Sequence, residues 1–114
     1  MLTLKGRTAV ITGGSRGIGF AIASELAKGG MNVGILSVHD GTAKSAAKIL
    51  TEKGYICVGY QCDVADIASI KKALNYVNEF FGGIDVVVNS AGILDVFKVP
   101  SCIFVLFSPI ALIP

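Results

Sequence analysis

VITGGSRGIG, residues 10–19, places four glycines directly after a run of strand-forming residues. Without side chains at Gly13, Gly14, Gly17 and Gly19, another group can approach the main chain to contact distance. Where such a loop joins a strand to the start of a helix, backbone N–H groups and the helix dipole favour a bound phosphate. We therefore expect a phosphate-binding turn here, the alternative being a glycine-rich turn that binds no ligand.

Apolar periodicity switches regularly between strand and helix along the chain. Strands are predicted at residues 7–12, 32–37, 55–61 and 84–89. Three segments between them each have an apolar helical face, formed by Ile18, Ala21, Ile22 and Leu26, by Ala43, Ala46, Ala47 and Leu50, and by Ile67, Ile70, Leu74, Val77 and Phe81. Glycines after each segment end the helices, and Asp66 is the expected N-cap of the third. This alternation predicts an α/β fold with a doubly wound parallel sheet of Rossmann type, strand order 3-2-1-4, and a ligand at the carboxyl ends of the strands.

Composition excludes several other classes of protein. The 114 residues suffice for one small core, and a net charge of +2 without a basic, aromatic-rich run argues against nucleic-acid binding. Cys57, Cys62 and Cys102 lack metal-ligand spacing, and His39 is the only histidine, so no metal site is expected. An odd number of cysteines and a first strand that begins near residue 7 favour reduced thiols and a cytoplasmic location.

The glycine spacing after Thr12 is Gly-x-x-x-Gly-x-Gly, and three further motifs follow it in order. They are CDV at residues 62–64, FGGIDVVVN at residues 81–89 and NSAG at residues 89–92. Together these motifs resemble those of the short-chain dehydrogenase/reductase family, over residues 4–94. Within that family the chain is most similar to the 3-oxoacyl-carrier-protein reductase and carbonyl reductase branches.

The resemblance implies a site for a nicotinamide dinucleotide. Its cofactor-binding residues would be Thr12, Gly13, Ser15, Arg16, Gly17, Ile18, Gly19, Ser37, Asp63, Val64, Asn89, Ala91 and Gly92. The glycine turn would hold the pyrophosphate and the adjoining ribose, Asp63 and the Val64 backbone would contact adenine, and Asn89 with Gly92 would flank the adenosine ribose. Two alternatives stay open, because Asp63 could simply cap a turn and Asn89 could belong to an ordinary polar strand end.

The residue that ends the second strand bears on the choice between NAD and NADP. An NAD-selective site places an acidic side chain there against the ribose 2′-hydroxyl, whereas this chain has Ser37. Arg16 stands where similar family members keep a basic group facing the 2′-phosphate, and a guanidinium suits that anion. NADP is therefore the expected cofactor. Two alternatives stay open. Asp40 could be the acidic residue of an NAD-selective site if the strand ends later, and Arg16 could be only a solvated cation of the loop.

The catalytic residues that the resemblance implies are absent from this sequence. The family transfers hydride with a Tyr-x-x-x-Lys pair and a serine, and the tyrosine exchanges a proton with the carbonyl oxygen. Four places after Tyr55, Tyr60 and Tyr76 stand Gly59, Val64 and Phe80, so no such pair exists. Ser90 belongs to the strand-end motif and is not assigned as the catalytic serine. Whether this chain is an enzyme by itself is therefore uncertain.

Residues 95–114 depart from the family pattern and divide the chain into a dinucleotide-binding half-domain at 1–94 and a non-family apolar tail. The tail has no charge after Lys98, and Pro109 interrupts its apolar run, which argues against a membrane span. Residues 102–107 are expected to form a strand that packs on or associates with other apolar surface, beside the fourth strand, which would otherwise be a sheet edge. A frameshift or altered splicing near Leu94 would explain such a tail.

Two hypotheses about function follow. In one, the chain is the NADP-binding portion of a carbonyl-reducing or alcohol-oxidising enzyme that is active only with a missing C-terminal half. In the other, it is a catalytically silent nucleotide-binding product or a dimer-poisoning module. Full-length family members are expected to be homo-oligomers, and the exposed edge of the sheet favours self-association of this chain.

Overall fold

The computed structural model describes residues 4–15, 17–90 and 104–107. Its elements in chain order are β1 (Thr8–Thr12), α1 (Gly17–Lys28), β2 (Asn32–Ser37), α2 (Asp40–Glu52), β3 (Cys57–Gln61), α3 (Ile67–Phe81), β4 (Val86–Asn89) and β5 (Phe104–Phe107). The alternation predicted from the sequence is therefore confirmed. β2 has the predicted bounds, and β1, β3 and β4 begin one or two residues later than expected. No helix in the described ranges is long and apolar enough to span a membrane.

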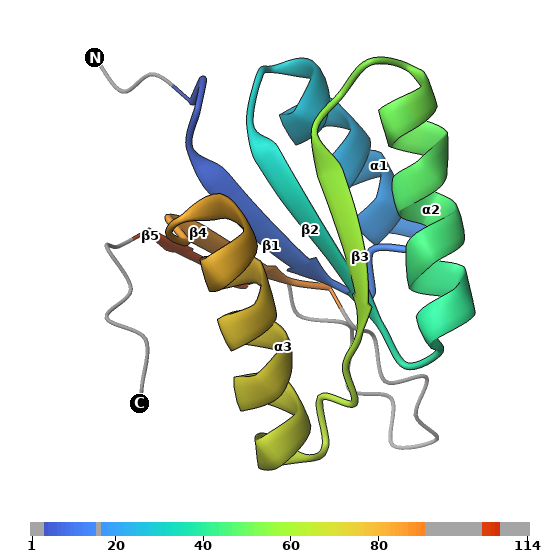
Figure 1. The fold of residues 1–114 in the computed structure, drawn as a ribbon, viewed down its shortest axis with the longest axis vertical. Coiled ribbons are helices and arrows are strands. Elements are labelled where there is room, and N and C mark those ends of the chain that lie inside the picture. The colour runs from blue at the N-terminus through green and yellow to red at the C-terminus, as the bar shows by residue number, and fades with distance from the viewer. Residues whose placement is uncertain (1–3, 16, 91–103, 108–114) are drawn as a thin grey trace.

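The strands form one sheet with the order β3-β2-β1-β4-β5 (Figure 1). The first four are parallel, in the 3-2-1-4 order expected from the sequence. β5 adds to β4 in the antiparallel direction, with Val86 opposite Phe107 and Asn89 opposite Phe104. The strand expected in the tail is therefore present over residues 104–107, and it lies beside β4, which would otherwise form the edge of the sheet.

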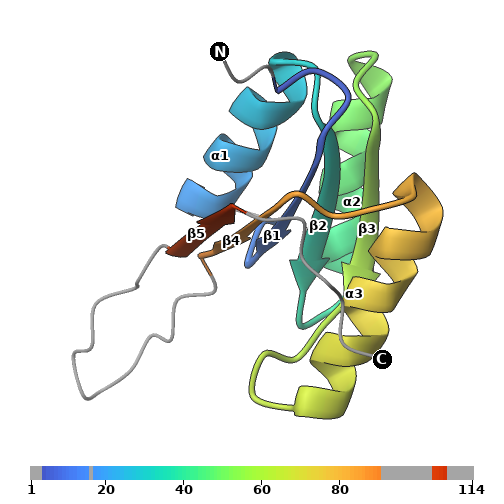
Figure 2. The same ribbon diagram turned by 90° about the vertical axis from the view of Figure 1, so that its left-hand side faces the viewer.

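Two apolar layers hold the helices on opposite faces of the sheet (Figure 2). Alternate residues of a strand point to opposite faces, so Ile11 and Ile35 meet α1 and α2 while Val10 and Leu36 meet α3. The helices contribute small or branched residues to these layers, among them Ala23, Ala27, Ala46, Leu50, Ala73 and Val77. The sheet is thereby buried on both faces over β1 and β2, as a parallel sheet requires.

The structure corrects the predicted faces of two helices. Ile18 is 67% exposed and Ala21 is also exposed, whereas α1 buries Gly19, Ala23 and Ala27. Ile67 is 72% exposed, because it is the first residue of α3 and lies beyond the sheet. The small residues of α1 were overlooked because an alanine or glycine contributes little to an apolar pattern, yet it lets the helix approach the sheet closely.

The ends of α3 follow the predicted capping chemistry. The Asp66 carboxylate accepts a hydrogen bond from the Ala68 N–H at 3.0 Å. Gly82 ends the helix in the left-handed conformation with φ of 82°, and its N–H donates to the Asn78 carbonyl. Asp85 then fixes the entry to β4, because its carboxylate accepts from the Thr8 N–H at 2.8 Å and pairs with Arg7 at 3.5 Å.

Gly59 allows α2 to pack directly on β3. A Cβ at this position would overlap the backbone of Ala43, whereas a Cβ at Gly41, in the first turn of α2, would meet no atom within 4 Å. We expect Gly59→Ala to lower the free energy of unfolding by about 1–3 kcal/mol, as overpacking does. Gly41→Ala, the matched control, should cause no loss. Urea unfolding followed by circular dichroism measures both, and equal midpoints for the two variants would contradict this account of the packing.

Candidate nucleotide-binding site

The carboxyl ends of the four parallel strands lie along one edge of the sheet. Thr12 of β1 stands between Leu36 of β2 and Asn89 of β4, and Ser37 of β2 stands beside Gln61 of β3. Ligands of doubly wound α/β proteins bind at this edge. The structure therefore brings together the described members of the predicted site: the glycine turn, Ser37, the segment after β3 and Asn89.

The glycine turn begins with two backbone bonds to β2. The N–H groups of Gly13 and Gly14 donate to the Leu36 carbonyl at 2.8 and 3.3 Å, which fixes the start of the turn. Gly13 and Gly17 both have positive φ, 65° and 63°, a conformation that side chains disfavour. Because α1 starts at Gly17, the N–H groups of its first turn have no carbonyl one turn earlier in the helix. These N–H groups are suited to hold a phosphate at the carboxyl end of β1.

Gly19, in the first turn of α1, packs against Gly13 of the glycine turn and against Ser90, which follows β4. A Cβ on Gly19 would overlap the Gly13 carbonyl oxygen and Ser90 Oγ, so a glycine is required for this packing. Ser90 in turn donates to the Thr12 carbonyl from both its N–H, at 3.2 Å, and its hydroxyl, at 3.1 Å. Ser90 thus fastens β4 to β1, a structural contact at the strand end where the sequence motif placed it.

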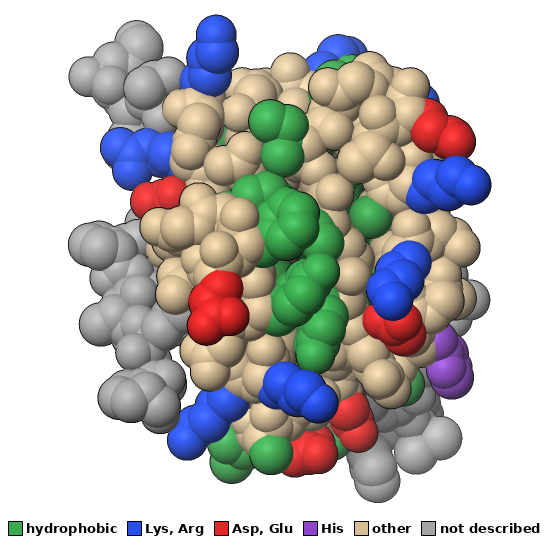
Figure 3. All heavy atoms as spheres, viewed as in Figure 1, with side chains coloured by type: hydrophobic (Ala, Val, Ile, Leu, Met, Phe, Trp, Pro, Cys, Tyr) green, Lys and Arg blue, Asp and Glu red, His purple; other side chains and the backbone are tan. Residues whose placement is uncertain are grey.

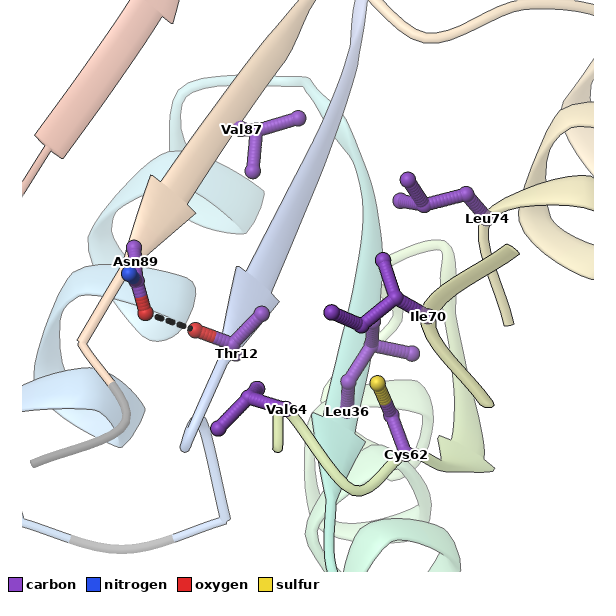
Figure 4. Close-up of a pocket in the computed structure, with 8 residues that line it drawn as sticks. All are labelled: Thr12, Leu36, Cys62, Val64, Ile70, Leu74, Val87 and Asn89. Carbon is purple, nitrogen blue, oxygen red and sulfur yellow. Dashed lines mark hydrogen bonds between the residues drawn. The ribbon is translucent and has the colours of Figure 1, made fainter. Parts of the chain in front are cut away.

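A side-chain hydrogen bond joins the same two strands. Thr12 Oγ1 donates to Asn89 Oδ1 at 2.7 Å, across the β1–β4 pair (Figure 4). The bond is part-buried, and it holds the Asn89 amide in one orientation. The Asn89 side chain therefore braces β4 against β1.

The segment after β3 forms a tight turn. Asp63 Oδ1 accepts a hydrogen bond from the Ala65 N–H at 3.0 Å, and the Asp63 N–H donates to Ser69 Oγ at 2.9 Å. The turn-capping alternative for Asp63 is thus realised for one carboxylate oxygen. The same contacts fix Asp63 and Val64 at the carboxyl edge of the sheet, where an adenine contact would also require them.

A pocket of about 380 Å³ opens beside this turn, between the sheet and α3. Its lining is mainly apolar and comprises Thr12, Leu36, Cys62, Val64, Ile70, Leu74, Val87 and Asn89 (Figure 4). Sequence reasoning had placed Thr12, Val64 and Asn89 at a site, and it had assigned Ile70 and Leu74 to the core. Cys62 and Leu36 were missed as lining residues, although both immediately adjoin predicted site residues in the sequence.

The end of β2 is tied to the start of α2. The Ser37 hydroxyl, on a buried residue, lies 2.8 Å from both the His39 carbonyl oxygen and Thr42 Oγ1. Asp40 is the first residue of α2 and pairs with Lys44 at 2.8 Å, a contact that raises the pKa of Lys44. The strand therefore ends at Ser37 as expected, and Asp40 is engaged within the helix.

The two described cysteines are free thiols with little tendency to ionise. Burial raises the pKa of Cys57 to about 12 and also raises the pKa of Cys62. Neither is suited to act as a nucleophile, because the thiolate is the reactive form. Among the described residues, no three His, Cys, Asp or Glu side chains are grouped to hold a metal ion.

Arg16, Ala91 and Gly92, which the sequence also assigned to the site, lie outside the described residues. So does the greater part of the tail, with β5 as its described segment.

We expect the Thr12–Asn89 hydrogen bond to be measurable as a coupling energy. A double-mutant cycle of Thr12→Val and Asn89→Ala should give about 0.5–1.5 kcal/mol in urea unfolding, because each variant removes one partner of the bond. Thr51→Val is the matched control, since the Thr51 hydroxyl bonds to backbone carbonyls within α2. Its effect should add to that of Asn89→Ala, and additivity of the Thr12 pair as well would contradict the proposed coupling.

Comparison with known proteins identifies the family. The family model for short chain dehydrogenases matches residues 7–102. The chain is 39% identical to an uncharacterized oxidoreductase of Thermotoga maritima over 93 residues, 82% of this chain and 36% of that protein. It is 39% identical to the 3-oxoacyl-[acyl-carrier-protein] reductase of Vibrio harveyi over 92 residues, 81% of this chain and 36% of that protein.

A solved structure agrees with these sequence matches. A short chain dehydrogenase/reductase from Burkholderia phymatum in complex with NAD superposes with a TM-score of 0.73 at 29% identity, over 76% of this chain and 31% of that one. The chain thus spans about a third of the length of the relatives that it matches. It belongs to the short-chain dehydrogenase family of oxidoreductases, and it has the nucleotide-binding fold of that family.

Proposed function

We propose that the chain is the NADP(H)-binding portion of a short-chain oxidoreductase that reduces carbonyls or oxidises alcohols. The observation that carries the proposal is the glycine turn, which presents the first turn of α1 at the carboxyl end of β1, next to Asn89. Asp63 follows β3 along the same edge of the sheet. The family match supports a nicotinamide cofactor, which supplies or accepts hydride when bound. As part of the same proposal, residues 1–94 form the nucleotide-binding half-domain and residues 95–114 a non-family apolar tail, in a cytoplasmic protein with reduced thiols.

The residues of the site fit a dinucleotide. Gly17, Ile18 and Gly19 would offer backbone N–H groups to the pyrophosphate from the first turn of α1. Ser15 and Thr12 would add hydroxyl groups beside them. The second carboxylate oxygen of Asp63 would accept a hydrogen bond from the adenine amino group, next to the Val64 backbone. Asn89, Ala91 and Gly92 would then flank the adenosine ribose.

Three features support NADP over NAD, two at the end of β2 and one in the glycine turn. β2 ends in a serine rather than in the acidic residue that binds a free ribose 2′-hydroxyl. Asp40, the alternative acidic selector, pairs with Lys44 inside α2. Arg16 in the glycine turn would supply the positive charge for the 2′-phosphate.

The second candidate function is a catalytically silent nucleotide-binding module that could poison oligomers of a full-length relative. The absence of Tyr-x-x-x-Lys from the 114 residues favours it for the chain acting alone. The two candidates share the same cofactor site, and they differ in whether further catalytic residues work with this chain.

Arg16→Ala tests the cofactor preference. We expect it to weaken NADPH binding by about 1.5–3 kcal/mol, the range for a hydrogen bond to a charged group, which is roughly 10- to 150-fold in Kd. NADH binding should change little, because NADH lacks the 2′-phosphate. Fluorescence titration of the full chain with both cofactors measures the effect. Lys28→Ala, which removes a positive charge from the far end of α1, is the control.

Equal affinity of the unaltered chain for NADPH and NADH would overturn the NADP assignment but keep the dinucleotide site. Failure of a folded chain to bind either cofactor would overturn the site itself.

The purified 114-residue chain should show no hydride transfer between NADPH and carbonyl compounds. No residue at the family's position is present to give a proton to the developing alkoxide, and such acid–base catalysis is worth about 10²–10⁴-fold in rate. The assay follows NADPH absorbance with and without the chain. Turnover that rises in proportion to chain concentration, and persists through a second purification, would show that these residues suffice for catalysis.

A further inference from the structure

The β5 end of the sheet differs from the β3 end in what surrounds it. β3 packs against α2 on one face and against α3 on the other, whereas the neighbour of β5 in the described residues is β4. Figures 1 and 2 show β5 at the far end of the sheet, beyond the strands on which the helices lie. The outer edge of β5 therefore has backbone N–H and C=O groups without a strand partner in the described part of the chain.

The sequence of β5 and of the residues after it lacks the charged residues that commonly protect an edge strand. Such strands commonly carry a lysine or another charge, or are covered by a helix, because an open edge pairs with other strands. β5 reads FVLF, and no charged residue follows Lys98. Strands of aromatic and β-branched residues with no charge pair readily.

We propose that two copies of this chain associate by antiparallel pairing of their β5 strands. Identical strands fit one another in this direction, because a twofold axis perpendicular to the sheet reverses the strand and leaves its faces unchanged. Residues that lie opposite one another in antiparallel strands point to the same face, so this axis sets one residue opposite its own copy. With Val105 opposite Val105 of the other copy, Phe104 lies opposite its Leu106. Two uncharged strands meet without like-charge repulsion, so a second copy is the partner that the edge fits best.

This arrangement joins the two five-stranded sheets into one continuous sheet. The axis keeps α1 and α2 of both copies on one face and α3 of both on the other. Since β5 already runs antiparallel to β4, the new pair continues an antiparallel sequence of strands at the centre of the joined sheet. The nucleotide-binding edge stays open, because it is formed by the ends of the strands and not by their sides.

A second exposed apolar surface is an alternative interface for self-association of the chain. Hydrophobic side chains gather along the seam between α3 and β3 (Figure 3), where Tyr60 stacks on Tyr76 with ring centroids 4.3 Å apart. Phe80 adjoins Tyr76 and is 57% exposed. Ile49 on α2 is another exposed apolar residue, 48% accessible.

The test is light scattering after size-exclusion chromatography of the full chain over a range of concentrations. We expect the mass of a dimer, and we expect Val105→Lys to raise its dissociation constant at least about tenfold, because the charge is placed at both halves of a symmetric interface. Ile49→Lys and Phe80→Lys add the same charge away from β5 and should leave the dimer intact. Circular dichroism confirms that each variant is folded.

Hydrogen exchange of the unaltered chain supplies a second measurement that needs no variant. Amides of residues 104–107 should exchange at least about tenfold more slowly in the dimer than on dilution to monomer, whereas amides of β3 should not change. A monomer at every concentration would overturn the proposal, and so would a dimer that survives in folded Val105→Lys. If that variant does not fold, exchange at residues 104–107 that is independent of concentration overturns it equally.

Discussion

The meeting of β1 and β4 beneath the first turn of α1 constrains the rest of the site. Ser90 donates twice to the Thr12 carbonyl, Thr12 donates to Asn89, and Gly19 packs against both Gly13 and Ser90 with no space for a Cβ. These contacts link two strands that are far apart in sequence, and they set the position of the helix start against both. The N–H groups suited to an anion are consequently held by the same interactions that hold the sheet together.

Much of the fold could be predicted because its signals are local. Asp66 and Gly82 specify the ends of α3 by capping chemistry, and the alternating strands and helices specify the parallel order. The depth to which a helix approaches the sheet is not a local property. Ile18 carries a strong apolar signal and is exposed, whereas Gly19 and Ala23 carry a weak one and are buried. Gly19 packs against Gly13 and Ser90 with no space for a Cβ, and the small side chain of Ala23 lets α1 approach the core.

The candidate site, too, could be predicted only in part from the sequence. The spacing of Thr12, the glycines and Asn89 predicts which strand ends meet, and the structure brings them together. Their partners were not predictable from a pattern, since the Leu36 carbonyl that holds the glycine turn is a backbone group and depends only on the register of β1 with β2. The pocket lining of Cys62, Ile70 and Val87 likewise arises from packing between α3 and the sheet, which sequence periodicity reports only as core.

The direction of β5 explains why the two ends of this sheet behave differently. A further parallel strand beside β4 would need a crossover connection, typically a helix that covers the sheet as it returns. An antiparallel strand needs no crossover, so the pairing of β5 with β4 does not require a helix between them. Within the described part of the chain, β3 is covered by α2 and α3, whereas β5 has β4 as its neighbour. In the described part of the chain, the backbone N–H and C=O groups at this edge of the sheet therefore belong to β5 instead of β4. The strand ends that form the nucleotide site are unaffected.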